Sequence, residues 1–437
     1  MGRVSHPIER IRVSFDDPSL VANAGLLLVG TLVGRLELER LVNAMVRLGG
    51  RVGGARPGRK VLTLVHAMVA GGSHIDHADV LRSGNTAGVL PHRVMAPSTL
   101  GTFLRSFTFG HVRQLEAVVG EVLRRAWALG AGPGSARLVI DVDSTICEVE
   151  GHQKQGAAFG YTKVLGYHPI LATRADTGEV LHARMHKGSA NTARGPRRFL
   201  DELIARVRRA GATGEIVVRV DSGFWSKDTI ATLSRLNVRY TMAVRTNTKG
   251  VAEAIAAIDE DAWRDIDYTP DGEAQVAECT YKGRRLIVRR TRLTDRVQAR
   301  LWPDWRHFGF VTDLDGDAVT VDAFHRAHAV VELDIRDLKE GAGMEHVPSG
   351  KFHANSAWLQ CTVLAHNLIR WTATVGQAAP IEQRIVARTV RQRLINIPGR
   401  LVNHAGTPTL RGPLNCPWRH WFQRRLATLR LLEPQTC

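Results

Sequence analysis

Two short segments of this 437-residue sequence each end in a carboxylate after alternating apolar residues. Residues 137–143 place Asp141 and Asp143 on one face of a predicted strand, because successive side chains of a strand point to opposite faces. Residues 215–221 form a second predicted strand, which Asp221 closes directly before Ser-Gly. Because open α/β sheets bind ligands at the carboxyl ends of their strands, both segments are candidates for one site.

A third carboxylate, Glu332, lies on a helix predicted over residues 324–339. At about 100° per residue, five polar side chains of this helix fall on one stripe roughly 80° wide. The five are His325, His328, Glu332, Arg336 and Lys339. Such a stripe cannot be a core face unless it lines a polar site. The pattern therefore indicates either a third element of the candidate site or a solvated helical face.

The chemistry of converging carboxylates is that of a metal site. They repel one another unless a cation lies among them, and oxygen ligands without cysteine favour Mg²⁺ or Mn²⁺. Two such ions about 4 Å apart can activate an attacking oxygen and stabilise a leaving oxygen during displacement at phosphorus. The residues thus predict a two-metal enzyme acting on nucleic-acid backbones, with Asp141 or Asp143 as its first carboxylate.

The same residues resemble the DDE transposases of bacterial insertion sequences, whose catalytic domain is RNase H-like and related to that of retroviral integrases. The matching segments are Asp141-Val-Asp143-Ser-Thr145, Val220-Asp221-Ser-Gly-Phe224, and the helix that carries Glu332 and, seven residues later, Lys339. On that helix the family has Tyr, Arg, Glu and Lys at fixed spacing. This sequence keeps the spacing but has His325 and His328 in place of Tyr and Arg.

The resemblance implies a role for each matching residue. Asp143, Asp221 and Glu332 become the catalytic, metal-binding triad. Asp143 is preferred to Asp141 because it directly precedes Ser144-Thr145, as the first aspartate of the family motif does. Lys339 becomes the phosphate contact. The other basic residues of the stripe, Arg336, His328 and His325, are further expected DNA contacts. Since neutral imidazoles gain a proton near pH 6.5, the two histidines would make the phosphate contact sensitive to pH.

The resemblance also implies an activity and partners. We expect a transposase that binds the terminal inverted repeats of its element, cuts DNA with water and joins the 3′-hydroxyl ends to target DNA, as a homodimer in the end complex. The strand-rich insertion before the Glu helix is typical of members that cut and paste through DNA hairpins. No Lys is followed by Ser or Thr, which excludes a standard P-loop, so ATP is not an expected partner.

Three other functions are compatible with the sequence. The first is a metal nuclease of the same fold that cleaves DNA without strand transfer. The second is a catalytically silent DNA-binding protein derived from a transposase. The third is a structural nucleic-acid-binding protein that owes nothing to the carboxylates.

A mixed sheet flanked by helices is needed to position these residues. The sequence predicts an α/β fold: an RNase H-like mixed sheet with flanking helices, a strand-rich insertion and a helical N-terminal domain. Predicted strands cover residues 137–143, 168–174, 179–186, 215–221, 238–244 and 308–312. Predicted helices cover residues 196–209, 226–236, 324–339 and 357–371. A hairpin with a Lys282-Gly283 turn is predicted over residues 276–290.

Glycine, proline and charge divide the chain into predicted domains. The clearest boundary is the GAGPGS segment, Gly130–Ser135. The predicted divisions are a helical DNA-binding domain (1–130), a first catalytic part (131–245), a β-rich insertion (246–306), a second catalytic part with the Glu helix (307–375) and a basic tail (376–437). A helix start at Pro97-Ser98-Thr99 predicts a helix-turn-helix, with a plain helical bundle as the alternative.

The charge balance favours a polyanionic partner. Lys and Arg number 59 against 42 Asp and Glu, a net charge of +17. The tail from Gly376 holds ten Arg and two Glu, which predicts a DNA-contacting arm or a solvated helical face. The longest apolar run, Ala24–Gly30, is too short for a bilayer, and the first residues lack a signal-peptide pattern. We therefore expect no membrane partner and a cytoplasmic, nucleoid-associated protein.

Two further polar clusters are interpreted as ordinary surface. His74, Asp76, His77 and Asp79 suit a solvated helix start better than a metal site. Asp313, Asp315 and Asp317 imitate a calcium loop, but Ala and Phe stand where that loop requires Gly and Glu, which predicts a turn.

Overall fold

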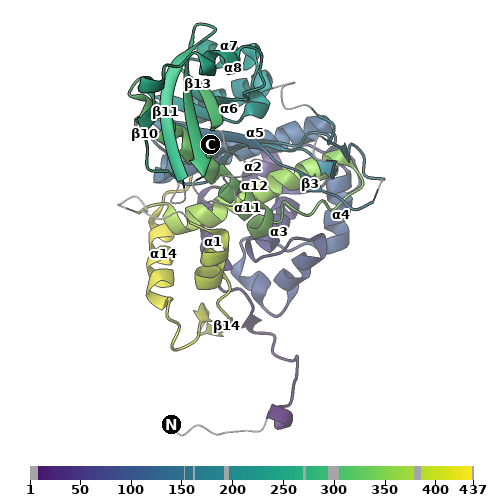
Figure 1. Cartoon of the computed structure of the whole chain (residues 1–437). Coiled ribbons are helices and arrows are strands. Elements are labelled where there is room, and N and C mark those ends of the chain that lie inside the picture. The colour runs from purple at the N-terminus through teal and green to yellow at the C-terminus, as the bar shows by residue number, and fades with distance from the viewer. Residues whose placement is uncertain are drawn as a thin grey trace.

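A nine-stranded mixed sheet forms the centre of the described chain (Figure 1). The computed structural model describes residues 8–151, 153–160, 163–190, 196–268, 272–293, 305–377 and 385–435. The strand order is β10-β11-β12-β13-β9-β8-β2-β6-β7. The predicted mixed sheet with flanking helices is confirmed.

Five strands, from β9 to the edge strand β7 in this order, lie near their predicted positions. They are β2 (Leu138–Ser144), β6 (Ile170–Arg174), β7 (Val180–Arg184), β8 (Ile216–Val220) and β9 (Arg239–Val244). β2, β6 and β7 form an antiparallel meander, whereas β8 lies parallel to both β2 and β9. Strands buried on both faces need continuous apolar sequence, which explains the valine and isoleucine content of β8. The parallel pair β2 and β8 brings both predicted carboxylate ends to the same edge.

The strand-rich insertion extends this sheet. β11 (Gly272–Tyr281) and β12 (Arg284–Leu293) form the predicted hairpin, and its turn residues Lys282 and Gly283 have φ of 49° and 72°. Positive φ at both central residues is what a type I′ turn requires. β13 (Arg306–Thr312) joins the hairpin to β9, and the short β10 (Arg264–Asp265) borders β11.

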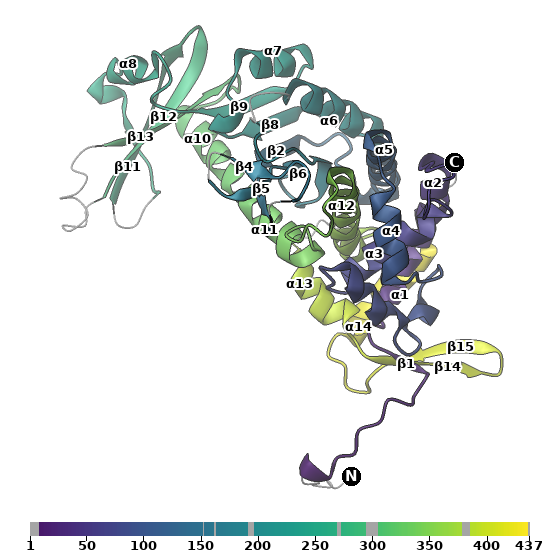
Figure 2. The same ribbon diagram turned by 90° about the vertical axis from the view of Figure 1, so that its right-hand side faces the viewer.

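Helices cover both faces of the central strands. In Figure 2, α6 (Pro196–Ala210) and α7 (Lys227–Arg235) lie above the strands and α12 (Phe352–Thr374) lies below them. The predicted helices at 196–209, 226–236 and 357–371 are confirmed, α12 being longer than expected. All residues of α12 from 354 to 373 are buried.

α12 also closes the free edge of the sheet at β7. The Asn367 side-chain amide donates to the Val180 carbonyl, and its oxygen accepts from the Val180 amide, both at 2.8 Å. Gln360 Nε2 donates to the Ala183 carbonyl at 3.1 Å. An edge strand otherwise offers unpaired backbone groups to other chains, so these side chains take the place of a further strand.

The N-terminal helices pack against the other side of α12. They are α1 (Leu26–Arg35), α2 (Leu38–Met45), α3 (Pro57–Val69), α4 (Pro97–Arg105) and α5 (Phe109–Ala126). α4 begins at the predicted Pro97. A three-residue turn separates α4 from α5, as in a helix-turn-helix, yet α5 packs against α2, α6 and α12. The DNA-binding role of this region stays a prediction.

The basic tail packs back onto the N-terminal helices. It contains α13 (Ala387–Val390), the hairpin of β14 (Gly399–His404) and β15 (Thr407–Arg411), and α14 (Arg419–Leu431). β14 pairs with β1 (Leu20–Val21), and α14 packs on α1. Arg391 donates to the carbonyls of Met68 and Val69, and the buried Arg425 donates to those of Thr372 and Val375. Two of the tail arginines are therefore structural.

Short elements complete the fold. A small sheet contains β3 (Cys147–Glu148), β4 (Ala158–Phe159) and β5 (Leu165–Tyr167), and α8 (Val251–Ala256) lies near the insertion. None of the helices in the described segments combines the length and apolarity that crossing a bilayer requires.

Candidate active site

The first two carboxylates lie at the ends of adjacent parallel strands. Val142 of β2 pairs with Val220 of β8, so the next residues lie side by side, Asp143 still within β2 and Asp221 directly after β8. Both residues are half-buried. Two of the three predicted triad residues are thus placed together by strand register.

The electrostatics of the site disfavour charge on both aspartates. The pKa of Asp143 is raised to about 6, chiefly by burial, and the charges of Asp221 and Glu332 raise it further, against the lowering effects of the Ser144 amide and of His328. Burial is also the main cause of the raised pKa of Asp221. A cation among such oxygens would remove the penalty. The donor set therefore fits a hard divalent ion.

The third carboxylate, Glu332, lies in the first turn of α11 (Val330–Ala342) and is exposed. α11 contacts β2, and Glu332 is near enough to Asp143 to raise its pKa. The donor atoms of Asp143, Asp221 and Glu332 do not all lie within 4.8 Å of one another. Among the described residues, a different group meets that spacing and is treated below.

The prediction of one uninterrupted α-helix over residues 324–339 is wrong. α10 (Ala318–Arg326) and α11 are joined by a 3₁₀ turn, Ala327–Ala329. The backbone of Ala329 has right-handed helical dihedral angles, so the 3₁₀ turn continues the helical path from α10 into α11. His325, before the turn, and His328, within it, both bind strands of the sheet.

Asp141 is fully buried and already neutralised. Arg219 of β8 lies opposite it in register and donates from Nε and Nη2 to its two oxygens, both at 2.7 Å. His328 Nδ1 lies 2.7 Å from Asp141 Oδ1. A carboxylate held by two partners in this way is not open to an ion. Of the two candidates for the first carboxylate, the geometry favours Asp143.

The two histidines of the predicted stripe face the protein. His325 Nδ1 lies 2.7 Å from Thr241 Oγ1, and its ring stacks on Phe310 with centroids 4.1 Å apart. Burial lowers the pKa of His325 to about 3. In this arrangement His325 packs against the sheet and His328 binds Asp141, so both rings make contacts within the protein.

The two cations of the stripe are placed differently. Arg336 is exposed on α11, and Lys339 Nζ donates to the Ile146 carbonyl at 2.8 Å. Ile146 is the second residue after β2, so the Glu332 helix is tied to β2 through His328 near one end and to the segment after β2 through Lys339 near the other.

Comparison with known proteins agrees with this geometry. A family model described as "Transposase DDE domain group 1" matches residues 5–434, nearly the whole chain. The chain belongs to this DDE transposase family. No curated protein matches it.

A solved structure shares the fold of this transposase. The piggyBac transposase in its synaptic complex with hairpin DNA, determined by cryo-electron microscopy, has a TM-score of 0.50 and 13% identity. The match covers 88% of this chain and 80% of the piggyBac chain. The likeness supports the α/β fold with a large mixed sheet and flanking helices.

Arg219 is not predicted as a residue of the site, although the transposase sequence contains an indication of its role. Arg219 interrupts the apolar run of β8, and a charged side chain in a buried strand needs a partner. Asp141 stands at the same step of the neighbouring strand. Pairing the two would have removed Asp141 from the candidates before the structure was known.

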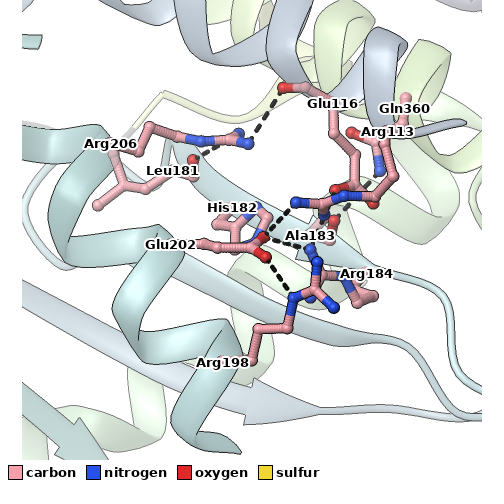
Figure 3. Close-up of polar contacts among 10 residues, drawn as sticks. All are labelled: Arg113, Glu116, Leu181, His182, Ala183, Arg184, Arg198, Glu202, Arg206 and Gln360. Carbon is pink, nitrogen blue, oxygen red and sulfur yellow. Dashed lines mark hydrogen bonds and ion pairs between the residues drawn. The ribbon is translucent and has the colours of Figure 1, made fainter. Parts of the chain in front are cut away.

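A second acidic cluster of the transposase lies elsewhere, where α5, α6 and β7 meet (Figure 3). Glu116, His182 and Glu202 bring their donor atoms within 4.8 Å of one another. Arginines surround them: Arg113 and Arg184 each contact both glutamates. Further contacts come from Arg198 and Arg206. Since guanidinium groups already neutralise these carboxylates, the cluster is better explained as an ion-pair network that joins three elements.

Proposed function

We propose that this DDE transposase binds the terminal inverted repeats of its own element and catalyses DNA cleavage and strand transfer with two divalent ions, Mg²⁺ or Mn²⁺. Asp143, Asp221 and Glu332 would hold the ions. Bound ions would activate the attacking water or 3′-hydroxyl and stabilise the leaving oxygen. The observation that carries the proposal is the placement of Asp143, within β2, and Asp221, directly after β8, side by side, with the charge of Glu332 acting on Asp143.

The surrounding residues support this function by positioning the three carboxylates. Arg219 fixes Asp141, two residues before Asp143, and therefore holds the end of β2 in place. His328 links the same Asp141 to the chain just before Glu332. We infer that His328 is a positioning residue and that the family's Arg has been replaced here by a contact within the protein.

DNA is the proposed partner. Support comes from the net charge of +17 and from the similar fold of piggyBac transposase, whose solved complex contains hairpin DNA. Near the active site, the proposed phosphate contacts are Arg336 and Lys339, because both lie on α11, the helix that carries Glu332. Joining two ends of one element requires two active sites, and we propose a homodimer in the end complex.

The test is cleavage and joining of element-end DNA. Asp143→Asn, Asp221→Asn and Glu332→Gln should each abolish Mg²⁺-dependent cleavage but keep end binding in Ca²⁺, because ion binding and not the fold is lost. Two exposed carboxylates, Asp228 and Glu340, provide matched controls, and their amide variants should cleave normally.

Each outcome separates the proposed function from another one. Full cleavage by a triad variant would remove that residue from the site. Cleavage without strand transfer by the unaltered protein would indicate a metal nuclease. End binding without any cleavage would indicate a silent DNA-binding protein.

A further inference from the structure

An apolar N-terminal arm, residues 8–16, extends away from the body of the protein in both views (Figures 1 and 2). Its large apolar side chains are exposed: Ile8 by 81%, Ile11 by 63%, Val13 by 77% and Phe15 by 100%. Ile11, Val13 and Phe15 alternate, so they share one face when the arm is extended. An uncovered apolar face of this kind marks a contact surface.

The arm is fixed to the body only at its root. Asp17 pairs with Arg400 at 2.5 Å, the Leu401 amide donates to the Ser19 carbonyl at 2.9 Å, and β1 pairs with β14. In the described part of the chain, the hydrogen bonds of residues 8–16 join arm residues to one another. The apolar face therefore has no partner among the residues that the structure describes.

An apolar groove lies next to this root. A cavity of about 700 Å³ separates α1, the β14–β15 hairpin and α14, the elements that form the lower end of the molecule in Figure 1. Apolar side chains from all three elements line it, including Leu27, Leu401, Leu410, Phe422 and Leu426. Leu414, 83% exposed, and the partly exposed Cys416 lie on its wall.

We propose that the arm of one copy fills the groove of a second copy, and that the second arm fills the first groove. One chain carries both an uncovered apolar strand and an uncovered apolar groove, and the pairing of β1 with β14 directs the strand outward, away from the body. Exchange of identical segments about a two-fold axis satisfies both surfaces and closes the assembly at a dimer. The proposal concerns a surface remote from the carboxylates and does not rest on the proposed chemistry.

A disulfide test uses the native Cys416. The first chain carries Phe15→Cys together with Cys416→Ser. The second chain has a different tag and keeps Phe15 and Cys416. In both chains Cys279 and Cys437 are replaced by serine. Mild oxidation of the mixed full-length proteins should give a disulfide between the two tags. A chain with Phe15→Cys and native Cys416 tests whether the arm instead fills the groove of its own chain. A disulfide within that single chain, with none between the tags, would overturn the exchange, as would no disulfide in either sample.

The oligomeric state provides a second measurement. Phe15→Asp and, on the groove wall, Leu414→Asp change exposed side chains and should leave the monomer folded, yet each should weaken the dimer at least tenfold in sedimentation equilibrium. Ser14→Asp changes the other face of the arm and is the matched control. Equal dimer dissociation constants for Phe15→Asp, Leu414→Asp and Ser14→Asp would contradict the proposal.

Discussion

Asp141 and Arg219 form a buried two-point ion pair across the parallel strands β2 and β8, with both nitrogen–oxygen distances at 2.7 Å. The pair lies two residues before Asp143 and Asp221 on the same two segments of the chain. The arrangement explains how an acidic site can be built on strands that are otherwise apolar. Asp141 binds Arg219 across the two strands, and the half-buried Asp143 and Asp221 are the proposed metal ligands.

Breaking this pair should destabilise the protein strongly. Asp141→Asn leaves the Arg219 guanidinium buried without its counter-charge, so the free energy of unfolding should fall by about 3–5 kcal/mol. Urea unfolding followed by circular dichroism measures the change. Asp79→Asn breaks an exposed ion pair with Arg82 and should cost less than about 1 kcal/mol. A similar small loss in both variants would show that the buried pair has no special structural role.

Acid should destabilise the protein through His325. Its pKa is lowered to about 3 by burial, with Arg219, Arg289 and His328 nearby, whereas an unfolded histidine titrates near about 6.5. Between these values the unfolded chain binds a proton that the native chain does not. The free energy of unfolding therefore falls as pH decreases from about 6.5 to about 3, by about 1.4 kcal/mol per pH unit for this residue.

The variant His325→Phe keeps the stack on Phe310 and should make this pH dependence shallower, whatever its effect at neutral pH. His404→Gln changes an exposed histidine and should leave the slope as it is. Identical slopes for His325→Phe and the unaltered protein would mean that His325 is charged in the folded state. The same neutral ring argues against a His325 phosphate contact that strengthens near pH 6.5.

The exposed arginines of the tail should contribute salt-dependent DNA affinity. Arg393, Arg411 and Arg424 are exposed, so their joint replacement by Gln should reduce the slope of log affinity against log salt by up to about 0.9 for each phosphate that the variant no longer neutralises. Fluorescence anisotropy at several salt concentrations measures the slope. Arg425→Gln is a poor probe, because its buried guanidinium binds backbone carbonyls and its removal costs stability. An unchanged slope in the triple variant would place the DNA elsewhere.

The helix of Glu332 should contact phosphate through its cations. Arg336→Ala and Lys339→Ala should each weaken binding of element-end DNA roughly tenfold, the usual loss for a hydrogen bond to a charged group. Lys351→Ala, which removes an exposed cation outside α11, should have little effect and is the control. Binding assays in Ca²⁺ compare the three. Normal affinity of both α11 variants would restrict the role of this helix to Glu332.

Sequence patterns predicted the sheet well because strand alternation is a local property. The segments around Asp143 and Asp221 could be located from valine and isoleucine spacing, and the hairpin from Lys282-Gly283. The choice between Asp141 and Asp143 required the partner strand, because both face the same side of β2. Arg219, 78 residues away along the chain, binds Asp141, and this contact is the reason for proposing Asp143.

Other features depended on tertiary contacts that no local pattern contains. The helical stripe from His325 to Lys339 was drawn on an ideal helix, but His325 packs on β13 and His328 binds β2, and the helix tightens between them. Likewise, the charge of the tail could not show that Arg391 and Arg425 hold backbone carbonyls in the interior.

The position of α12 in the chain has a consequence for the order of synthesis. Its residues leave the ribosome after the first 350, yet it completes the core beneath α3 and α5 and covers the edge of β7. Until then, the nascent N-terminal helices lack their main apolar partner and the β7 edge is open to other strands. A fragment that ends before α12 should therefore aggregate.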